Sequence, residues 1–222
     1  MNNDIKKWGL LTGYSVVLMA LVAGFFYGFV HATIYKAGDS DLTAKLLQEN
    51  ISIYKWGIAS WILIFVLDII VSVGLYIIYK DEQKKLALLS SVLRIIYTLI
   101  LGIAVIQLTI PLINNSEISK GLLYFESFEK IWSLGLIIFG FHLLALGVIC
   151  FKSNFTSKFF GIFLGFGGLC YLLVQNLKSF FPHLSETTTT IESILTAPMA
   201  LSEISFAIWL IVKFYRLKRS VN

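Results

Sequence analysis

Residues 56–79 read WGIASWILIFVLDIIVSVGLYIIY, and they contain a single charged side chain, Asp68, at their middle. About 20 apolar residues in a helix, at about 1.5 Å per residue, cross a hydrocarbon core of about 30 Å. This stretch is therefore predicted to be a transmembrane helix. A charged carboxylate at the bilayer centre costs about 2.5–3.5 kcal/mol on insertion scales, so we expect a polar partner for Asp68 elsewhere in the chain.

The composition of the whole chain is that of a membrane protein. Hydrophobic residues make up 57% of its 222 positions and charged residues 14%, whereas soluble domains carry about 25% charged residues. The sequence predicts an all-α fold, one helical membrane bundle over residues 1–222, with the lipid bilayer as its surroundings. The net charge of +5 does not indicate a nucleic-acid partner, because no basic face or recognition motif accompanies it. Cys150 and Cys170 lie in apolar segments and are interpreted as core residues, not as a disulfide.

Five further apolar segments accompany the first one. The six predicted transmembrane spans are 10–30, 56–79, 86–113, 131–151, 159–180 and 196–212. The first of them is too long for a signal peptide, whose apolar region has about 7–15 residues, and is predicted to be retained. Within it, Gly24 and Gly28 are expected to let a neighbouring helix approach closely.

Polar segments between the spans predict one or two short amphipathic helices on the outer surface. One is expected near residues 41–53, lying on the membrane, with a cap from Asp39 or from one of the next two residues. An apolar patch at residues 122–125 is expected to rest on the same surface. Residues 181–195, which contain the run ETTTT, are expected to form a loop.

Basic residues are distributed unequally between the two sides of the predicted bundle. Six spans place 11 of the 18 Lys and Arg residues on the side of the chain termini, 6 on the other side, and Arg94 within the membrane. Cytoplasmic loops of membrane proteins carry the excess of Lys and Arg. The chain is therefore predicted to lie in the cytoplasmic (inner or plasma) membrane with both termini in the cytoplasm.

Four ionisable side chains fall inside the predicted spans. At about 1.5 Å per residue, Asp68, Arg94 and His142 share one level about 18 Å below the outer interface, and Glu203 lies about 10 Å deep. Ionisable groups within the membrane are functional candidates by default. These four are the candidate ligand- or ion-binding residues, and the secondary candidates are Gln107, Gln175 and Asn176.

The polar set allows more than one function. In one interpretation these residues line a pocket that binds or moves a small solute or a proton. In another, Asp68 and Arg94 form a structural ion pair, and the chain is a non-catalytic membrane component that assists a partner membrane protein. An intramembrane enzyme with His142 as its base is the third alternative, and no catalytic residue is assigned.

Neither a metal nor a cofactor is predicted. A metal site would use Asp68, His142 and Glu203 as ligands, but the nearby Arg94 argues against it and no HExxH spacing is present. A haem with two His ligands is excluded, because only His142 lies in mid-membrane. The sequence also lacks phosphate-loop and serine-nucleophile motifs.

The order of several short motifs resembles a known family. They are Asp68 with Leu75-Tyr76, residues 86–89 (LALL) before Arg94, His142-Leu143-Leu144 with Gly147, Lys152-Ser153, Gly161, Gly165, Tyr171, and Ser202-Glu203 with Phe206 and Trp209-Leu210. Over residues 8–215 the chain resembles the bacterial multi-pass membrane family catalogued as domain of unknown function 4386. Such proteins tend to have a Gly-Phe-Leu-Pro turn where this chain has NFTS at residues 154–157. The family's activity is undefined, so the resemblance implies a membrane fold and no substrate.

Overall fold

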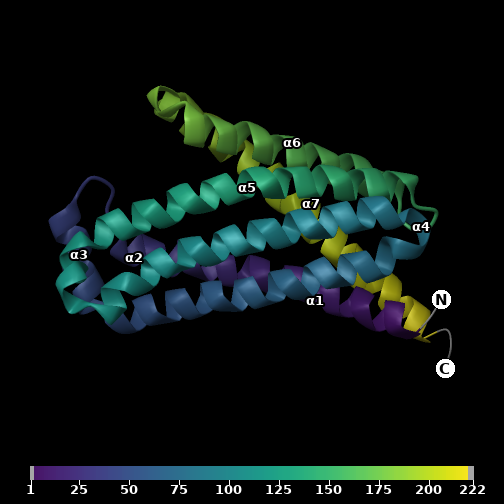
Figure 1. Ribbon diagram of the computed structural model, residues 1–222, viewed down its shortest axis with the longest axis horizontal. Helices are drawn as coiled ribbons and strands as arrows, with labels where there is room; N and C mark the ends of the chain where they lie inside the picture. The colour runs from purple at the N-terminus through teal and green to yellow at the C-terminus, as the bar shows by residue number, and fades with distance from the viewer. Residues whose placement is uncertain (1–2, 220–222) are drawn as a thin grey trace.

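The protein is a bundle of long helices that lie side by side (Figure 1). A computed structural model of the chain describes residues 3–219, with side chains for residues 4–217. Because the described residues contain no strand, the all-α prediction is confirmed. The elements are α1 (Asn3–Phe25), the π-helix η1 (Phe26–His31), α2 (Ala32–Ile34), α3 (Ser40–Glu49), α4 (Ile51–Ile113), the 3₁₀ helix η2 (Asn115–Lys120), α5 (Gly121–Lys152), α6 (Lys158–Phe180), the 3₁₀ helix η3 (Pro182–Leu184) and α7 (Ser185–Arg219).

Helix α4 contains two of the predicted spans. It has 63 residues, about 95 Å at 1.5 Å per residue and three times the thickness of a hydrocarbon core. Its backbone leaves helical geometry at Gln83, with φ −142° and ψ 55°. The chain turns back on itself there, at the end of the bundle where the N- and C-termini lie (Figure 1). The two arms of α4, residues 51–82 and 84–113, are antiparallel. With the other four long apolar helices, they give the six predicted passes.

Buried hydroxyl groups fix the register of the two arms of α4. Tyr54 donates to the carbonyl oxygen of Leu108 at 2.7 Å. Ser72 and Ser91 each donate to the other's carbonyl oxygen at 2.9 Å. Because a buried hydroxyl without a partner costs free energy, these bonds favour one register, and in it the middle of the first arm, which carries Asp68, faces the second arm.

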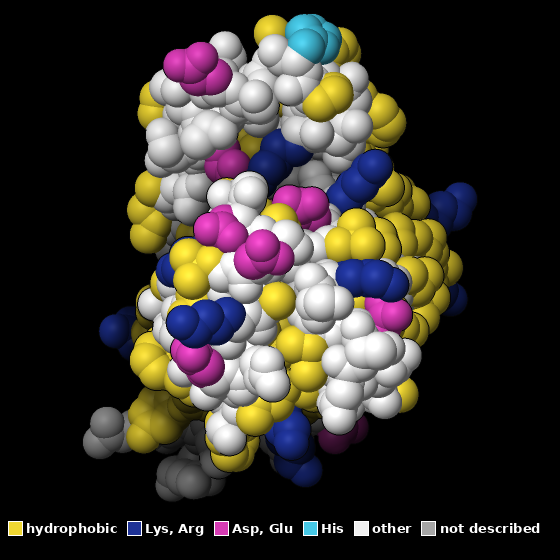
Figure 2. All heavy atoms as spheres, turned by 90° about the vertical axis from the view of Figure 1, so that its left-hand side faces the viewer, with side chains coloured by type: hydrophobic (Ala, Val, Ile, Leu, Met, Phe, Trp, Pro, Cys, Tyr) yellow, Lys and Arg dark blue, Asp and Glu magenta, His cyan; other side chains and the backbone are white. Residues whose placement is uncertain are grey.

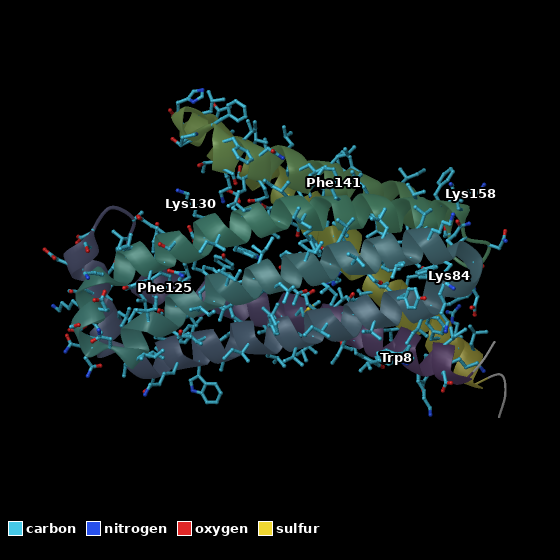
Figure 3. The ribbon with its side chains drawn as sticks, in the orientation of Figure 1. Trp8, Lys84, Phe125, Lys130, Phe141 and Lys158 are labelled. Carbon is cyan, nitrogen blue, oxygen red and sulfur yellow. The ribbon has the colours of Figure 1, made fainter. Side chains whose placement is uncertain are left out.

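The six passes form a ring. The neighbours in contact are α1 with α4, α4 with α5, α5 with α6, α6 with α7, and α7 with α1. We call one end of the ring the terminal end, because Lys6 at the start of α1 bonds there to the carbonyl oxygen of Leu217 in α7 at 3.1 Å. Lys84 and Lys158 lie at this end in Figure 3. The opposite end, which holds α3, is the α3 end.

The predicted amphipathic helix is present as α3. Asp39 caps it by accepting from the backbone N–H of Leu42 at 2.9 Å. Its apolar side faces protein instead of a membrane surface, because Leu47 is fully buried and would lie 3.0 Å from a Cβ placed on Gly121 at the start of α5. Helix α3 therefore closes one end of the bundle.

The prediction of a loop at residues 181–195 is wrong. After the short turn η3, helix α7 begins at Ser185 and includes the run of four threonines. Thr189 and Thr190 donate their hydroxyls to carbonyl oxygens four residues earlier, at 2.9 and 3.1 Å. Threonine hydroxyls bonded in this way are satisfied inside a helix, so the polar run does not interrupt it.

Two smaller expectations also fail. Residues 122–125 are the first turn of α5 and not a separate surface patch, since Phe125 is fully buried. Gly24 and Gly28 receive no neighbouring helix, because no atom lies within 4 Å of a Cβ placed on either of them. Gly24 on α1 and Gly28 on η1 both face open space.

Helix α7 has different neighbours along its length. Towards the terminal end it packs closely on α1, where a Cβ on Gly13 would lie 2.9 Å from the carbonyl oxygen of Ala207. Towards the α3 end it packs on α6 through a small cluster of Cys170, Val174 and Met199, which is separate from the main core. Seen from the α3 end, the α6–α7 tip is a distinct lobe, and charged side chains gather in the depression beside it (Figure 2). Helices α1 and α7 therefore separate towards the α3 end.

Candidate functional site

The three polar residues predicted at one depth contact one another. Asp68 Oδ1 lies 2.5 Å from Nη2 of Arg94, and the two side chains are 2% and 3% exposed. Nη1 of the same guanidinium lies 3.2 Å from Nε2 of His142 on α5. Arg94 therefore joins the two arms of α4 to α5 through one buried network.

His142 is held at both ring nitrogens. Its Nδ1 lies 2.8 Å from the carbonyl oxygen of Ser90 and 2.9 Å from the hydroxyl of the same residue. Its Nε2 faces Arg94, and a guanidinium can only donate. Nε2 is therefore the acceptor, Nδ1 carries the proton, and the ring is neutral. Since the side chain is fully buried, it does not present a base to a substrate.

Two buried N–H donors near this network have no partner. The Nε of Arg94 makes no hydrogen bond among the described residues, although the guanidinium carbon lies 5.1 Å from the ring centre of Phe139. The indole N–H of Trp61, a side chain that is 1% exposed, is also unpaired. Buried donors without a partner are rare in folded proteins, so these two groups indicate a site for an acceptor.

Glu203 stands apart from the ion pair. Its carboxylate accepts from the hydroxyl of Tyr171 on α6 at 3.1 Å. None of the ion pairs among the described side chains includes it. The side chain is half-buried and borders the same space as Asp68 and Arg94. Glu203 is therefore an acidic side chain on the wall of a cavity, and no basic side chain of the described residues lies within ion-pair distance of it.

The cavity lies between α1 and α7 and has a volume of about 490 Å³. Its walls are largely apolar, and Asp68, Arg94 and Glu203 are the charged residues that line it. Six aromatic side chains line it as well: Tyr27, Trp61, Tyr97, Trp132, Phe139 and Tyr171. Sites for small molecules typically have volumes of about 300–1,000 Å³, apolar walls and a few polar groups, and this cavity has all three properties.

The cavity is open towards the α3 end. A second hollow of about 340 Å³ continues it and shares with it Tyr27, Trp132 and Ala200, among others. The charged side chains that line this second hollow, which we call the mouth, are Glu129, Lys178 and Glu192. Polar side chains therefore surround the route into the cavity.

The cavity is closed towards the terminal end. A layer of mostly apolar side chains, which includes Val71, Leu143 and Phe206, lies there against Arg94 and Glu203. Only about 10 Å³ of space is left within it, which is room for about one water molecule. The deep end of the cavity is therefore closed to a solute.

The secondary candidates lie in different places. Gln175 accepts from the hydroxyl of Ser133 at 2.7 Å and lines the mouth. Asn176 donates to a carbonyl oxygen of its own helix at 2.8 Å. Gln107 lies 13 residues beyond Arg94 on α4, about 20 Å along the helix axis. The structure therefore brings only Gln175 to the connected space.

Sequence reasoning did not find the aromatic wall. The rings of Tyr27 and Trp132 stack with their centres 5.8 Å apart, and Trp61 meets Trp132 edge-on at 5.1 Å. These residues come from three different helices, and aromatic residues are common near membrane interfaces in any case. Tyr27 lies in the π-helix η1, and π-turns occur frequently at functional sites, but only the structure shows this π-helix.

Metal-ligating residues are dispersed in the described part of the chain. No group of three or more His, Cys, Asp or Glu side chains among the described residues is placed to hold a metal ion. Arg94 bonds to both Asp68 and His142. Cys150 and Cys170 are buried and not joined in a disulfide, as predicted.

Relatives match almost the whole bundle. The model of the family described as "Domain of unknown function (DUF4386)" matches residues 11–213. An uncharacterized protein of Archaeoglobus fulgidus is 28% identical over 177 residues, which cover 80% of this chain and 94% of that protein. No solved structure matches the chain. Since the family model extends from α1 to α7, the chain belongs to the DUF4386 family.

Proposed function

We propose that this protein binds a small organic solute in the cavity between α1 and α7. The observation that carries the proposal is the cavity itself, about 490 Å³ of space that reaches three ionisable side chains. A bundle that needed only stability would fill such a space, because unfilled volume loses packing contacts. The apolar part of the solute fits the aromatic wall, and its polar group meets the charged residues.

The proposal includes an orientation. The terminal end faces the cytoplasm and the α3 end faces outwards, because 11 of the 18 basic residues belong to the terminal side. Two of those residues, Lys218 and Arg219, have side chains outside the described part of the structure. With this orientation the solute enters from outside through the mouth. Transport of the solute or of a proton would also require the sealed layer beside Glu203 to open.

A cavity-filling substitution is expected to abolish solute binding. Ala200 borders both the cavity and the mouth, so Ala200→Trp places an indole in the route of the solute. Thermal unfolding of the purified protein in neutral detergent is measured with a set of small organic compounds. A ligand at 100 times its Kd stabilises the folded state by about 2.7 kcal/mol. Compounds that bind in the cavity raise the melting temperature of the wild type but not that of Ala200→Trp.

Leu201→Trp is the matched control for this experiment. Leu201 is the next residue of α7, its side chain is 55% exposed, and it does not line the cavity or the mouth. This variant should respond to the same compounds as the wild type. The proposal is contradicted when every stabilising compound stabilises Ala200→Trp and Leu201→Trp equally, because binding then occurs outside the cavity.

One observation favours a second function, that of a non-catalytic membrane component. Asp68 and Arg94 are almost completely buried and pair with each other, which suits a structural ion pair. In this alternative the cavity receives a segment of a partner membrane protein instead of a solute. The two functions differ in the Ala200→Trp experiment, because a structural component gives no stabilisation by small compounds.

A further inference from the structure

We propose that the solute is an organic cation whose ammonium group lies between Glu203 and the faces of the aromatic side chains. This inference rests on the proposed function, because it names the class of solute for the same cavity. Three features of the described residues carry it: the charge balance of the cavity, its aromatic wall, and the charge of its mouth.

The charge balance of the cavity favours a cation. Asp68 and Arg94 neutralise each other through their short ion pair. The remaining charged group of the lining is Glu203, whose described partner is the neutral hydroxyl of Tyr171. A carboxylate in apolar surroundings is costly unless it is paired. A cationic solute supplies the counter-ion that the chain does not.

The aromatic wall suits an ammonium group. A cation within about 6 Å of the ring centre of Trp or Tyr is attracted by the negative face of the ring, and aromatic cages are a recurrent way to bind quaternary ammonium groups. Tyr27 and Trp132 present stacked rings to the cavity, and Tyr171 adds a third ring that is bonded directly to Glu203. One ring of the wall therefore lies directly beside the acid, and the stacked pair lines the same cavity.

The charge of the mouth also favours a cation. It is lined by two carboxylates, Glu129 and Glu192, and by one ammonium group, that of Lys178. Lys178 pairs with Glu192 at 2.8 Å, and Glu129 lies 3.0 Å from Nε2 of His31. An entrance with excess negative charge raises the local concentration of cations and lowers that of anions.

The unpaired donors indicate that the solute also contains a hydrogen-bond acceptor. The Trp61 indole N–H and the Arg94 Nε both belong to residues that line the cavity, and both need an acceptor. An anion would satisfy them, but it would lie beside Glu203 and Asp68. A cation that also carries a hydroxyl, ether or carbonyl oxygen satisfies the donors and the acid together. The class of solute is therefore a small organic cation, whose binding an oxygen acceptor strengthens further.

Three probes of similar size and different charge test the inference. They are phenyltrimethylammonium, its uncharged isostere tert-butylbenzene, and the anion benzenesulfonate. Binding to the purified full-length protein in neutral detergent is measured by titration calorimetry at low ionic strength, because salt screens the attraction. Phenyltrimethylammonium is expected to bind at least tenfold more tightly than either of the other probes.

Glu203→Gln tests the role of the carboxylate. The amide oxygen can still accept from the Tyr171 hydroxyl, so the fold is kept and the charge is lost. We expect at least tenfold weaker binding of phenyltrimethylammonium and unchanged binding of tert-butylbenzene. Glu186→Gln, at the exposed start of the same helix, serves as the control and should bind all three probes as the wild type does. The melting temperature of each variant confirms folding.

Several outcomes would overturn the inference. Equal affinity for the cation and its uncharged isostere, or unchanged cation binding in Glu203→Gln, shows that the carboxylate does not select charge. Tightest binding of benzenesulfonate shows that the unpaired donors select an anion. If, in these cases, the probes that bind the wild type no longer bind Ala200→Trp, they bind in the cavity. The solute site is then supported, and only its preference for a cation is rejected. If none of the three probes binds, the preference for a cation is rejected. The proposed function is then tested separately, by the melting-temperature experiment on the wild type and Ala200→Trp with the set of small organic compounds.

Discussion

Asp68→Asn and Arg94→Leu are each expected to lower the free energy of unfolding by about 3–5 kcal/mol, the cost of removing one partner of a buried ion pair. Both side chains are at most 3% exposed, so the remaining charge or dipole is almost completely withdrawn from water. Arg94→Leu also removes the donor that faces Nε2 of His142. Thermal unfolding of the purified variants in detergent, together with their yield from membranes, measures the effect.

The double variant Asp68→Leu/Arg94→Leu separates charge from packing. We expect it to recover most of the loss, because neither apolar side chain needs a partner. Recovery is incomplete, since His142 keeps an unpaired acceptor, which costs about 1–3 kcal/mol. When the pair is purely structural, the double variant still binds the solute; when it contacts the solute, binding is lost. Unchanged stability in either single variant would show that the two residues do not form a buried pair.

Gly147→Ala is expected to destabilise the bundle by about 1–3 kcal/mol, the usual cost of overpacking. A Cβ at Gly147 on α5 would lie 2.8 Å from the carbonyl oxygen of Gly161 and 2.9 Å from the backbone nitrogen of Gly165, both on α6. These are backbone atoms, so the helices must move apart to accept the methyl group. The change in melting temperature in detergent reports the loss.

Gly165→Ala is the matched control, with an expected effect of opposite sign. No atom lies within 4 Å of a Cβ at Gly165. Alanine is favoured over glycine in a helix interior by about 1 kcal/mol, so this variant should be as stable as the wild type or slightly more stable. Equal destabilisation by both substitutions would show that the α5–α6 contact is not where the structure has it.

The sequence was sufficient to predict the six passes, which follow from apolar length. It left the Asp68–Arg94 pair as one of two interpretations, because equal depth on the two arms of a helical hairpin permits a contact and does not require one. The position of Glu203 beside Arg94 depends on how α7 packs, which apolar length does not give. Both side chains line the cavity and the layer that closes it.

Other features depend on tertiary packing that sequence patterns do not encode. The run of four threonines is polar enough for a loop, but it is helical, with the hydroxyls of Thr189 and Thr190 bonded to carbonyl oxygens of the same helix and with Lys178 of α6 paired with Glu192 in the next turn of α7. The aromatic wall needs Tyr27, Trp61 and Trp132 to converge from three helices. Only the arrangement of the helices in space shows that convergence.

Cysteine labelling in intact cells tests most directly whether a water-filled cavity opens to the outside between α1 and α7. Single cysteines are introduced in a Cys150→Ala/Cys170→Ala background and treated with a membrane-impermeant maleimide. Ala200→Cys in the cavity should be labelled. Leu201→Cys, which faces the surroundings of the bundle, and Ala207→Cys, which is fully buried against α1, should not. For orientation, Lys45→Cys at the α3 end should be labelled and Lys84→Cys should not. An unlabelled Ala200→Cys in a protein that is labelled at Lys45→Cys would contradict the open cavity and, with it, the proposed solute site.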